Sequence, residues 1–217
     1  MVTEISAAGG RERSPLIEYI KDPQFKRLLS EVVARQHERD FRSLAILSRY
    51  PGEGKTFFAA VLALAYATFL RRRVLILDTI VQGSTGALYV GELLRESVNA
   101  GGRENLIEIV TSRALEEDEV SREEGAFGVP GIDFGIGDFL HRVSSDYDLV
   151  IVDTCALESS NTETLDPIIV ARQTEAALVV TSPRSAVDGS LDPLRRILSE
   201  SRVELLGAIY NGGRSDG

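Results

Sequence analysis

Cysteine, tryptophan and histidine are scarce in this chain of 217 residues, which has one cysteine, no tryptophan and two histidines. A single cysteine cannot form an internal disulfide, and the start of the sequence lacks the charged, apolar and small-residue regions of a secretory signal. We therefore expect a reducing, cytoplasmic location. His37 and His141 have no metal-ligand spacing with Cys155, so no zinc site is predicted, and we interpret Cys155 as a packed thiol rather than a nucleophile.

Long hydrophobic runs and excess positive charge are also missing. The longest apolar run, Phe57–Leu70, is shorter than the roughly 20 residues that cross a bilayer, so we interpret it as a buried helix that ends at Arg71–Arg73. The 24 Lys and Arg residues stand against 33 Asp and Glu residues, which gives a net charge of −9. This balance argues against a protein that coats a nucleic-acid backbone, and no nucleic-acid partner is expected.

Hydrophobic residues make up 43% of the chain and are arranged in short β-branched runs that alternate with helix-like stretches. The predicted strands are Ser43–Leu47, Val74–Asp78, Leu106–Val110, Leu149–Asp153, Ala177–Thr181 and Leu205–Tyr210. The predicted helices are Lys55–Leu70, Ala87–Ser97, Phe134–Ser144, Thr164–Arg172 and Leu191–Ser201, with one or two more within Pro15–Arg39. This alternation predicts an α/β fold in which a doubly wound, mainly parallel sheet lies between two helical layers.

The length fits one medium-sized domain. We predict a disordered N-terminus over residues 1–14 and a single domain over residues 15–217, with a mobile surface loop at Glu116–Gly131. In a doubly wound sheet, ligands bind at the carboxyl ends of the strands. The loops after Leu47, Asp78 and Asp153 are therefore the places to look for chemistry.

The segment SRYPGEGKTF, Ser48–Phe57, lies between a predicted strand and a predicted helix, the context of a phosphate-binding loop. Gly52 and Gly54 allow the backbone to turn its N–H groups toward phosphate oxygens. Lys55 is placed to reach the β- and γ-phosphates, and the Thr56 hydroxyl is placed to bind Mg²⁺. We assign cofactor binding to Pro51, Gly52, Glu53, Gly54, Lys55, Thr56 and Phe57.

The loop departs from the full pattern G-x-x-x-x-G-K-[ST] at one position, because Arg49 stands where the first glycine would be. A nucleotide site also needs an acid from another strand end to hold the magnesium shell and position water. Asp153 and Asp78 each follow four apolar residues at the end of a predicted strand. We therefore predict Lys55, Asp78 and Asp153 as catalytic residues and Thr56, Asp78 and Asp153 as metal-binding residues.

Four motifs occur in a characteristic order: PGEGKT, VLILD, YDLVIVDT and LLGAIYN. In this order they resemble the ParA/MinD-like P-loop ATPases and, most closely, the cytoplasmic kinase domain of the bacterial tyrosine kinases (BY-kinases) that govern capsule and exopolysaccharide export. The resemblance implies a P-loop NTPase fold, with ATP or ADP and Mg²⁺ as cofactors. It also implies that Asp78 marks the Walker A′ element, Asp153 is the Walker B acid, and Asn211 reads the adenine edge.

The same resemblance implies a protein partner, such as a membrane-bound polysaccharide co-polymerase, and recruitment to the inner face of the membrane, with a homo-oligomer as a further expectation. Several positions differ from the family pattern. Ile80 and Gln82 stand where the Walker A′ element has a second acid and an arginine, Leu29 replaces an arginine linked to ring assembly, and Tyr50 replaces the signature lysine of partition ATPases. The final residues, GGRSDG, contain no tyrosine, so the tyrosine-rich tail of the kinases is missing from this sequence.

Three functions fit these residues. The first is a MgATP-binding protein that transfers a phosphoryl group or hydrolyses ATP in exopolysaccharide assembly or export, with Asp78 or Asp153 orienting the acceptor. The second is a nucleotide-binding adaptor or regulator with little phosphoryl transfer, an alternative that Ile80 and Gln82 favour. The third is a ParA/MinD-like positioning ATPase that forms a dimer with ATP.

Overall fold

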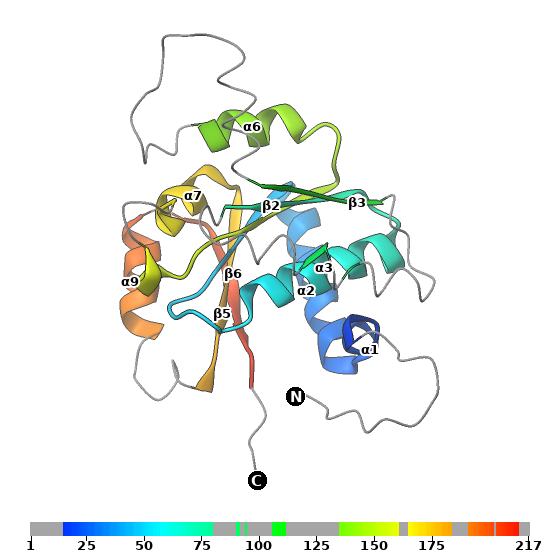
Figure 1. Cartoon of the computed structure of the whole chain (residues 1–217), viewed down its shortest axis with the longest axis horizontal. Helices are drawn as coiled ribbons and strands as arrows, with labels where there is room; N and C mark the ends of the chain where they lie inside the picture. The colour runs from blue at the N-terminus through cyan, green and yellow to red at the C-terminus, as the bar shows by residue number, and fades with distance from the viewer. Residues whose placement is uncertain are drawn as a thin grey trace.

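Six parallel strands form the centre of the structure, in the order β3-β2-β4-β1-β5-β6 (Figure 1). The computed structural model describes residues 15–79, 90, 91, 94, 106–111, 135–160, 165–183, 191–201 and 203–212. The strands are β1 (Ser43–Leu47), β2 (Val74–Asp78), β3 (Ile107–Thr111), β4 (Leu149–Asp153), β5 (Ala176–Thr181) and β6 (Leu205–Tyr210). Four of them have the predicted bounds and the other two differ by one residue, so the predicted parallel α/β sheet is confirmed.

Helices cover both faces of this sheet. One face carries α1 (Pro15–Lys21), α2 (Pro23–Arg39), α3 (Lys55–Ala65) and the π-helical turn η1 (Tyr66–Leu70). The other face carries α6 (Gly135–Val143), α7 (Pro167–Gln173) and α9 (Leu191–Glu200), and a short 3-10 helix, η3 (Leu157–Ser159), follows β4. The structure is therefore the three-layer, doubly wound arrangement that the alternating sequence pattern predicts.

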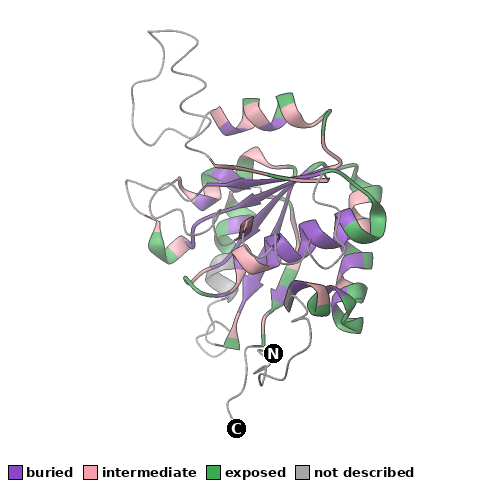
Figure 2. Cartoon of the chain, turned by 45° about the vertical axis from the view of Figure 1, so that its right-hand side comes forward, coloured by how far each residue is buried: buried purple, intermediate pink, exposed green. Residues whose placement is uncertain are grey.

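Alternating side chains of the strands form separate cores on the two faces. In β1, Leu44 and Ile46 pack against the α1, α2 and α3 layer, whereas Ala45 and Leu47 pack toward α7 and α9. All residues of β1, β2, β4 and β5 are buried. Figure 2 shows this burial in the central strands and in α3. Because successive side chains of a strand point to opposite faces, only a sheet covered on both sides buries such continuous apolar runs.

Local capping signals explain where α2 and α7 begin. The Asp22 carboxylate caps α2 by accepting from the N–H groups of Gln24 and Phe25, at 2.7 and 3.2 Å. Asp166 caps α7 in the same way, so α7 begins at Pro167 and not at the predicted Thr164. These two caps fix the first residue of each helix.

The predicted helix over Lys55–Leu70 differs from the structure in its last turn. The α-helical part ends at Ala65, and the turn that follows is a π-helix closed by Arg71 in the left-handed region, with φ of 57°. Of the predicted helix over Ala87–Ser97, only residues 90, 91 and 94 are described, and they are helical. The predicted disordered N-terminus, the loop at Glu116–Gly131 and the positions Ile80 and Gln82 lie outside the described residues. None of the helices within the described ranges combines the length and apolar character needed to cross a bilayer.

Candidate functional site

The carboxyl ends of the parallel strands bring the predicted site residues to one edge of the sheet. The loop Ser48–Gly54 follows β1, Asp78 ends β2, Asp153 ends β4, and Asn211 follows β6. Asp78 and Asp153 are register partners on adjacent strands, and Asp153 is also paired in register with Ile46 of β1. Residues far apart in the sequence thus meet at the carboxyl end of β1.

The two glycines of the loop have backbone conformations that other residues rarely adopt, with φ of 79° at Gly52 and 96° at Gly54. A Cβ atom at Gly54 would lie 2.6 Å from Nδ2 of Asn211, so a side chain there would displace the Asn211 amide and would also adopt a strained conformation. Gly54 is the N-cap of α3 and gives its first N–H groups no side-chain acceptor. The positive end of this helix is therefore open to an anion.

Arg49 shows why the missing first glycine is tolerated. Among the described non-glycine residues only Asp40 and Arg71 have positive φ, so the backbone at Arg49 does not require glycine. The guanidinium Nε of Arg49 pairs with Oε1 of Glu158 at 3.0 Å, and the Glu158 N–H donates to the Arg49 carbonyl at 3.0 Å. The start of the loop is thereby tied to η3, which follows the strand that carries Asp153.

Lys55 is held at the base of the loop. Its Nζ donates to Oγ of Ser48 at 2.7 Å, and the Ser48 hydroxyl donates to the Tyr50 carbonyl at 2.9 Å. The side chain is only 7% exposed, and burial lowers the pKa of the ammonium group while the negative charge of Asp153 opposes this shift. A cation held in this position can neutralise phosphate charge that enters the loop.

Asp153 is a buried carboxylate that has polar neighbours but lacks hydrogen-bond partners for its oxygens. Neither of its oxygens has a partner in hydrogen-bond geometry. Burial raises its pKa to about 7, although the Thr56 hydroxyl and the Lys55 ammonium both act to lower it. Its backbone carbonyl is fixed by Thr79, whose N–H and hydroxyl donate to it at 3.0 and 2.8 Å. Buried polar groups without partners are rare in folded proteins, and this one suits an added cation.

These residues fit Mg²⁺, which prefers oxygen ligands and is commonly held by one or two carboxylates together with substrate phosphates. Asp153 and Asp78 are 1% and 2% exposed, and Thr56 supplies a hydroxyl close to Asp153. Within the described ranges, no group of three or more His, Cys, Asp or Glu side chains could hold a metal ion. A cation here would take its further ligands from water or from a bound nucleotide.

Asn211 lies against the loop from the side of β6. Its Nδ2 donates to the Glu53 carbonyl at 2.9 Å, and its N–H donates to the Thr181 carbonyl at 2.7 Å. Its side chain is therefore part of the support of the loop, a role that sequence reasoning missed. Contact of Asn211 with an adenine edge stays a prediction.

The remaining predicted residues have distinct surroundings. Pro51 is exposed, and the ring of Phe57 packs edge-to-face on Tyr19 of α1, with centroids 5.3 Å apart. The backbone N–H of Phe57, in the first turn of α3, is then the group that a phosphate could contact. Cys155 is buried and its thiol donates to the Leu165 carbonyl at 3.3 Å, which agrees with the interpretation as a packed thiol.

Sequence reasoning missed the side chains that support the loop, namely Ser48, Glu158 and Ser182. Ser48 and Ser182 directly follow β1 and β5, and this position at a strand end is the one signal that could have indicated them. The contacts themselves join residues more than a hundred positions apart for Glu158 and Ser182. No local pattern in the sequence reports such pairs.

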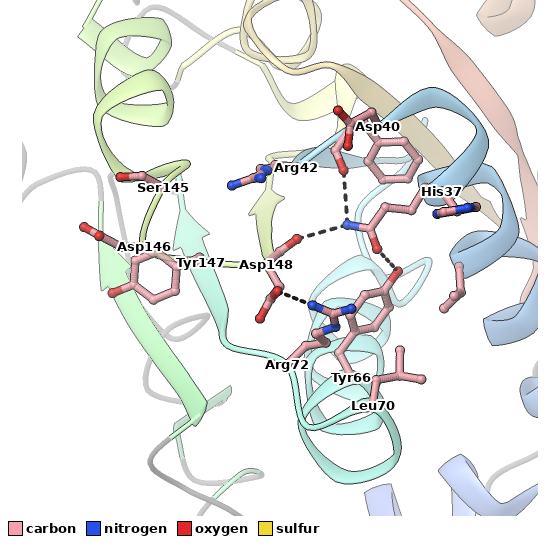
Figure 3. A pocket seen from close by; sticks show the side chains of 13 residues that line it. His37, Asp40, Arg42, Tyr66, Leu70, Arg72, Ser145, Asp146, Tyr147 and Asp148 are labelled. Carbon is pink, nitrogen blue, oxygen red and sulfur yellow. Dashed lines mark hydrogen bonds and ion pairs between the residues drawn. The ribbon is translucent and has the colours of Figure 1, made fainter.

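A hollow of about 530 Å³ lies at the opposite end of the sheet, between the end of α2, η1 and the segment before β4 (Figure 3). Its walls carry His37, Asp40, Arg42, Arg72 and Asp148, so both signs of charge are present. Arg72 pairs with Asp148 at 2.7 Å. None of the predicted site residues lines this hollow.

Comparison with known proteins relates the fold to solved structures. No protein-family model matches the chain, and a search of curated proteins found no match. The chimerical protein CapA2B2 superposes with a TM-score of 0.65 at 18% identity, over 91% of this chain and 88% of that one. The kinase domain of the Escherichia coli tyrosine kinase ETK superposes with a TM-score of 0.58 at 22% identity, over 88% and 76%. The septum site-determining protein MinD of Pyrococcus horikoshii OT3, solved with Mg-ADP, superposes with a TM-score of 0.54 at 18% identity, over 81% and 72%.

These likenesses establish the fold. The chain has the α/β fold of the BY-kinase domains and of the ParA/MinD ATPases, and the resemblance that the sequence motifs indicate is confirmed at this level.

Proposed function

We propose that this chain binds MgATP and MgADP in the loop Pro51–Phe57 and uses the bound nucleotide for phosphoryl transfer or hydrolysis. The observation that carries the proposal is the meeting of Lys55, Thr56 and Asp153 at an uncapped helix N-terminus. There, a buried ammonium group, a hydroxyl and a carboxylate without hydrogen-bond partners lie side by side. That set of charges is complementary to a phosphate chain and its cation.

Each residue has a role in this proposal. The N–H groups at the start of α3 and the Lys55 ammonium bind the phosphate oxygens. Thr56 and Asp153 hold the cation on one side, and Asp78, the register partner of Asp153, orients the attacking hydroxyl or water. When bound, Mg²⁺ would neutralise part of the phosphate charge. Asn211, on the β6 side of the loop, is proposed to meet the adenine edge.

The physiological setting is proposed from the sequence resemblance. We place the protein in the cytoplasm, at the inner membrane face when it is recruited, where a membrane-bound polysaccharide co-polymerase or another protein is its partner in exopolysaccharide assembly or export. The kinase domains of ETK, BceF and VpsO have this fold, which is compatible with a kinase-like role.

A nucleotide-binding adaptor is the second candidate. Ile80 and Gln82 stand in the sequence where the resembling kinases have an acid and an arginine. With fewer charged groups to stabilise the transferring phosphoryl group, turnover would be slow while binding through the loop remained. A ParA/MinD-like positioning ATPase is the third candidate, and dimer formation with MgATP in light scattering would separate it from the other two.

The deciding experiment is a calorimetric titration of the purified protein with ATP and with ADP, each in the presence and absence of Mg²⁺, together with a turnover assay of wild type and Asp78→Asn. Binding with turnover that Asp78→Asn removes supports the catalytic function. Binding with no turnover in either protein supports the adaptor. If wild type binds neither nucleotide, the proposed function is wrong.

A further inference from the structure

Glu53 is a buried acid inside the phosphate loop, an unusual place for a negative charge because a bound phosphate would repel it. The residue is 2% exposed, and burial lowers the pKa of the neighbouring Lys55 while the charge of Glu53 acts in the opposite direction. A carboxylate in this position is tolerated only when hydrogen-bond donors compensate its charge.

Within the described part of the chain, three such donors contact the Glu53 carboxylate. The Tyr50 N–H donates to Oε2 at 2.9 Å, and the N–H and hydroxyl of Ser182 donate to Oε1 at 3.0 and 2.9 Å. Tyr50 belongs to the loop after β1, and Ser182 directly follows β5, the strand paired with β1. The carboxylate therefore joins the phosphate loop to the carboxyl end of the neighbouring strand.

The same two strands carry a matching contact at their amino ends. Oε2 of Glu175, just before β5, accepts from the N–H groups of Arg42 and Ser43 at 2.6 and 2.9 Å and from the Ser43 hydroxyl at 3.2 Å. Both glutamates thus use two backbone N–H groups and one serine hydroxyl to join β1 to β5. They differ in their position relative to the phosphate loop and in exposure, since Glu175 is exposed.

We infer that Glu53 is a positioning residue of the phosphate loop, which it holds in its binding shape by joining Tyr50 to Ser182. This inference rests on the proposed nucleotide-binding function. Because Gly52 and Gly54 have many accessible conformations, a loop without this contact would populate its binding shape only part of the time. The apparent affinity for nucleotide falls by that fraction.

The contact made by Glu53 also determines which backbone groups of the loop remain available to a ligand. The Tyr50 N–H is used by Glu53, and the Glu53 carbonyl is used by Asn211, so both are directed to protein partners. The N–H groups at the start of α3 have no side-chain cap. Glu53 thereby acts through the backbone on both sides of itself, and it needs no contact with the nucleotide.

The test compares Glu53→Ala, Glu53→Gln and the matched control Glu175→Ala in MgADP calorimetry. Gln keeps one acceptor oxygen but presents a donor where Tyr50 and Ser182 also donate, so it can rescue only part of the effect. We expect Glu53→Ala to weaken MgADP binding by about tenfold or more and Glu53→Gln by less. Glu175→Ala should keep wild-type affinity even if it lowers the melting temperature.

A second readout needs no nucleotide. In hydrogen exchange followed by NMR, the amides of Tyr50 and Ser182 should lose protection in Glu53→Ala and keep it in Glu175→Ala. Ser182→Ala, which retains the Ser182 N–H contact, provides a milder variant in case Glu53→Ala does not fold, and we expect it to weaken MgADP binding by about threefold.

The outcomes separate the two proposals. If wild type binds MgADP and the Glu53 variants bind it equally well, the positioning role is wrong and the nucleotide-binding function stands. If wild type does not bind MgADP, the proposed function is wrong, and the positioning role that rests on it is wrong too, even where exchange shows the structural contact. Weaker binding in Glu53→Ala and Glu175→Ala alike would show a general loss of stability and would also overturn the positioning role.

Discussion

The two ends of the central sheet contrast in how their buried and half-buried polar groups are satisfied. At the carboxyl end, both oxygens of Asp153 are buried without a partner in hydrogen-bond geometry. At the amino end, Gln36 donates to the carbonyls of Phe41 and Asp148 at 3.1 and 3.0 Å and accepts from the Tyr66 hydroxyl at 3.0 Å. The hollow of Figure 3 lies at this amino end, yet Gln36, which lines it, has three protein partners.

This difference favours the carboxyl end as the ligand site that we propose. A hollow can arise wherever helix ends and loops pack imperfectly, whereas a buried carboxylate whose oxygens lack partners in hydrogen-bond geometry costs free energy in the folded protein. Such a cost is typical of functional sites, where a ligand removes it. The amino end is better understood as a junction that fixes α2, η1 and β4 to one another.

The strongest test of the contrast is Lys55→Ala. Removing the buried ammonium group should weaken MgADP binding by about 100-fold or more, because loss of one partner of a buried charge contact costs roughly 2–5 kcal/mol. Lys26→Ala, on the exposed side of α2, is the control and should bind as wild type does. Calorimetry measures both, and equal affinities in the two variants would mean that the carboxyl end is not the nucleotide site.

Asp153→Asn should separate function from stability. In the folded protein, burial raises the pKa of Asp153 from 3.8 to about 7, so the folded state holds this proton more tightly than the unfolded state does. The group therefore favours folding at low pH, and its contribution is lost as pH rises from 3.8 to about 7. At pH 8 the ligand-free Asn variant should be more stable than wild type, by up to about 4 kcal/mol at about 1.4 kcal/mol per pKa unit.

The same variant should lose Mg²⁺-dependent turnover, because an amide is a much weaker ligand for the cation than a carboxylate. Urea unfolding at pH 5 and pH 8 gives the stability of both proteins, and an ATPase assay gives the turnover. A variant that is no more stable than wild type at pH 8 would contradict the view that the Asp153 carboxylate is kept at a cost for function.

The strands and the site edge could be predicted from the sequence because their signals are local. Runs such as Val74–Asp78 and Leu149–Asp153 are apolar throughout and end in an acid, and parallel strands bring such ends together. The start of α7 could also have been predicted, since Asp166 followed by Pro167 is a typical N-terminal signal. The predicted first residue, Thr164, was three positions too early.

The long-range contacts that hold the phosphate loop in place could not be predicted in this way. Arg49 looked like a defect in the loop, and its pairing with Glu158 depends on how β1 and β4 lie side by side. The contact of Glu53 with Ser182 depends in the same way on the pairing of β1 with β5. No sequence pattern predicts the π-helical turn at Tyr66–Leu70 either, because a π-helix and an α-helix use the same apolar residues.

Gln36→Ala tests the amino end of the sheet. The change should leave nucleotide affinity unchanged and lower the free energy of unfolding by about 2–3 kcal/mol, because it leaves the buried Tyr66 hydroxyl and two carbonyls without this partner. Tyr66→Phe removes only one of these bonds, and the double variant gives the coupling energy between the two side chains. Urea unfolding measures all three, and a weakened nucleotide affinity in Gln36→Ala would show that the two ends are not independent.

Arg72→Ala should have the smallest effect. Its ion pair with Asp148 lies at the rim of the same hollow, with the two side chains 59% and 35% exposed. Exposed pairs contribute roughly 0–1 kcal/mol and are screened by salt, so the loss of stability should be less than about 1 kcal/mol and should shrink further in high salt. Asp148 also accepts from the Arg73 N–H at 2.9 Å, a contact that stays in the variant and keeps the carboxylate partnered. If Arg72→Ala instead lowered the free energy of unfolding as much as Gln36→Ala does, the exposed ion pair and not the half-buried Gln36 amide would be what holds the amino end together.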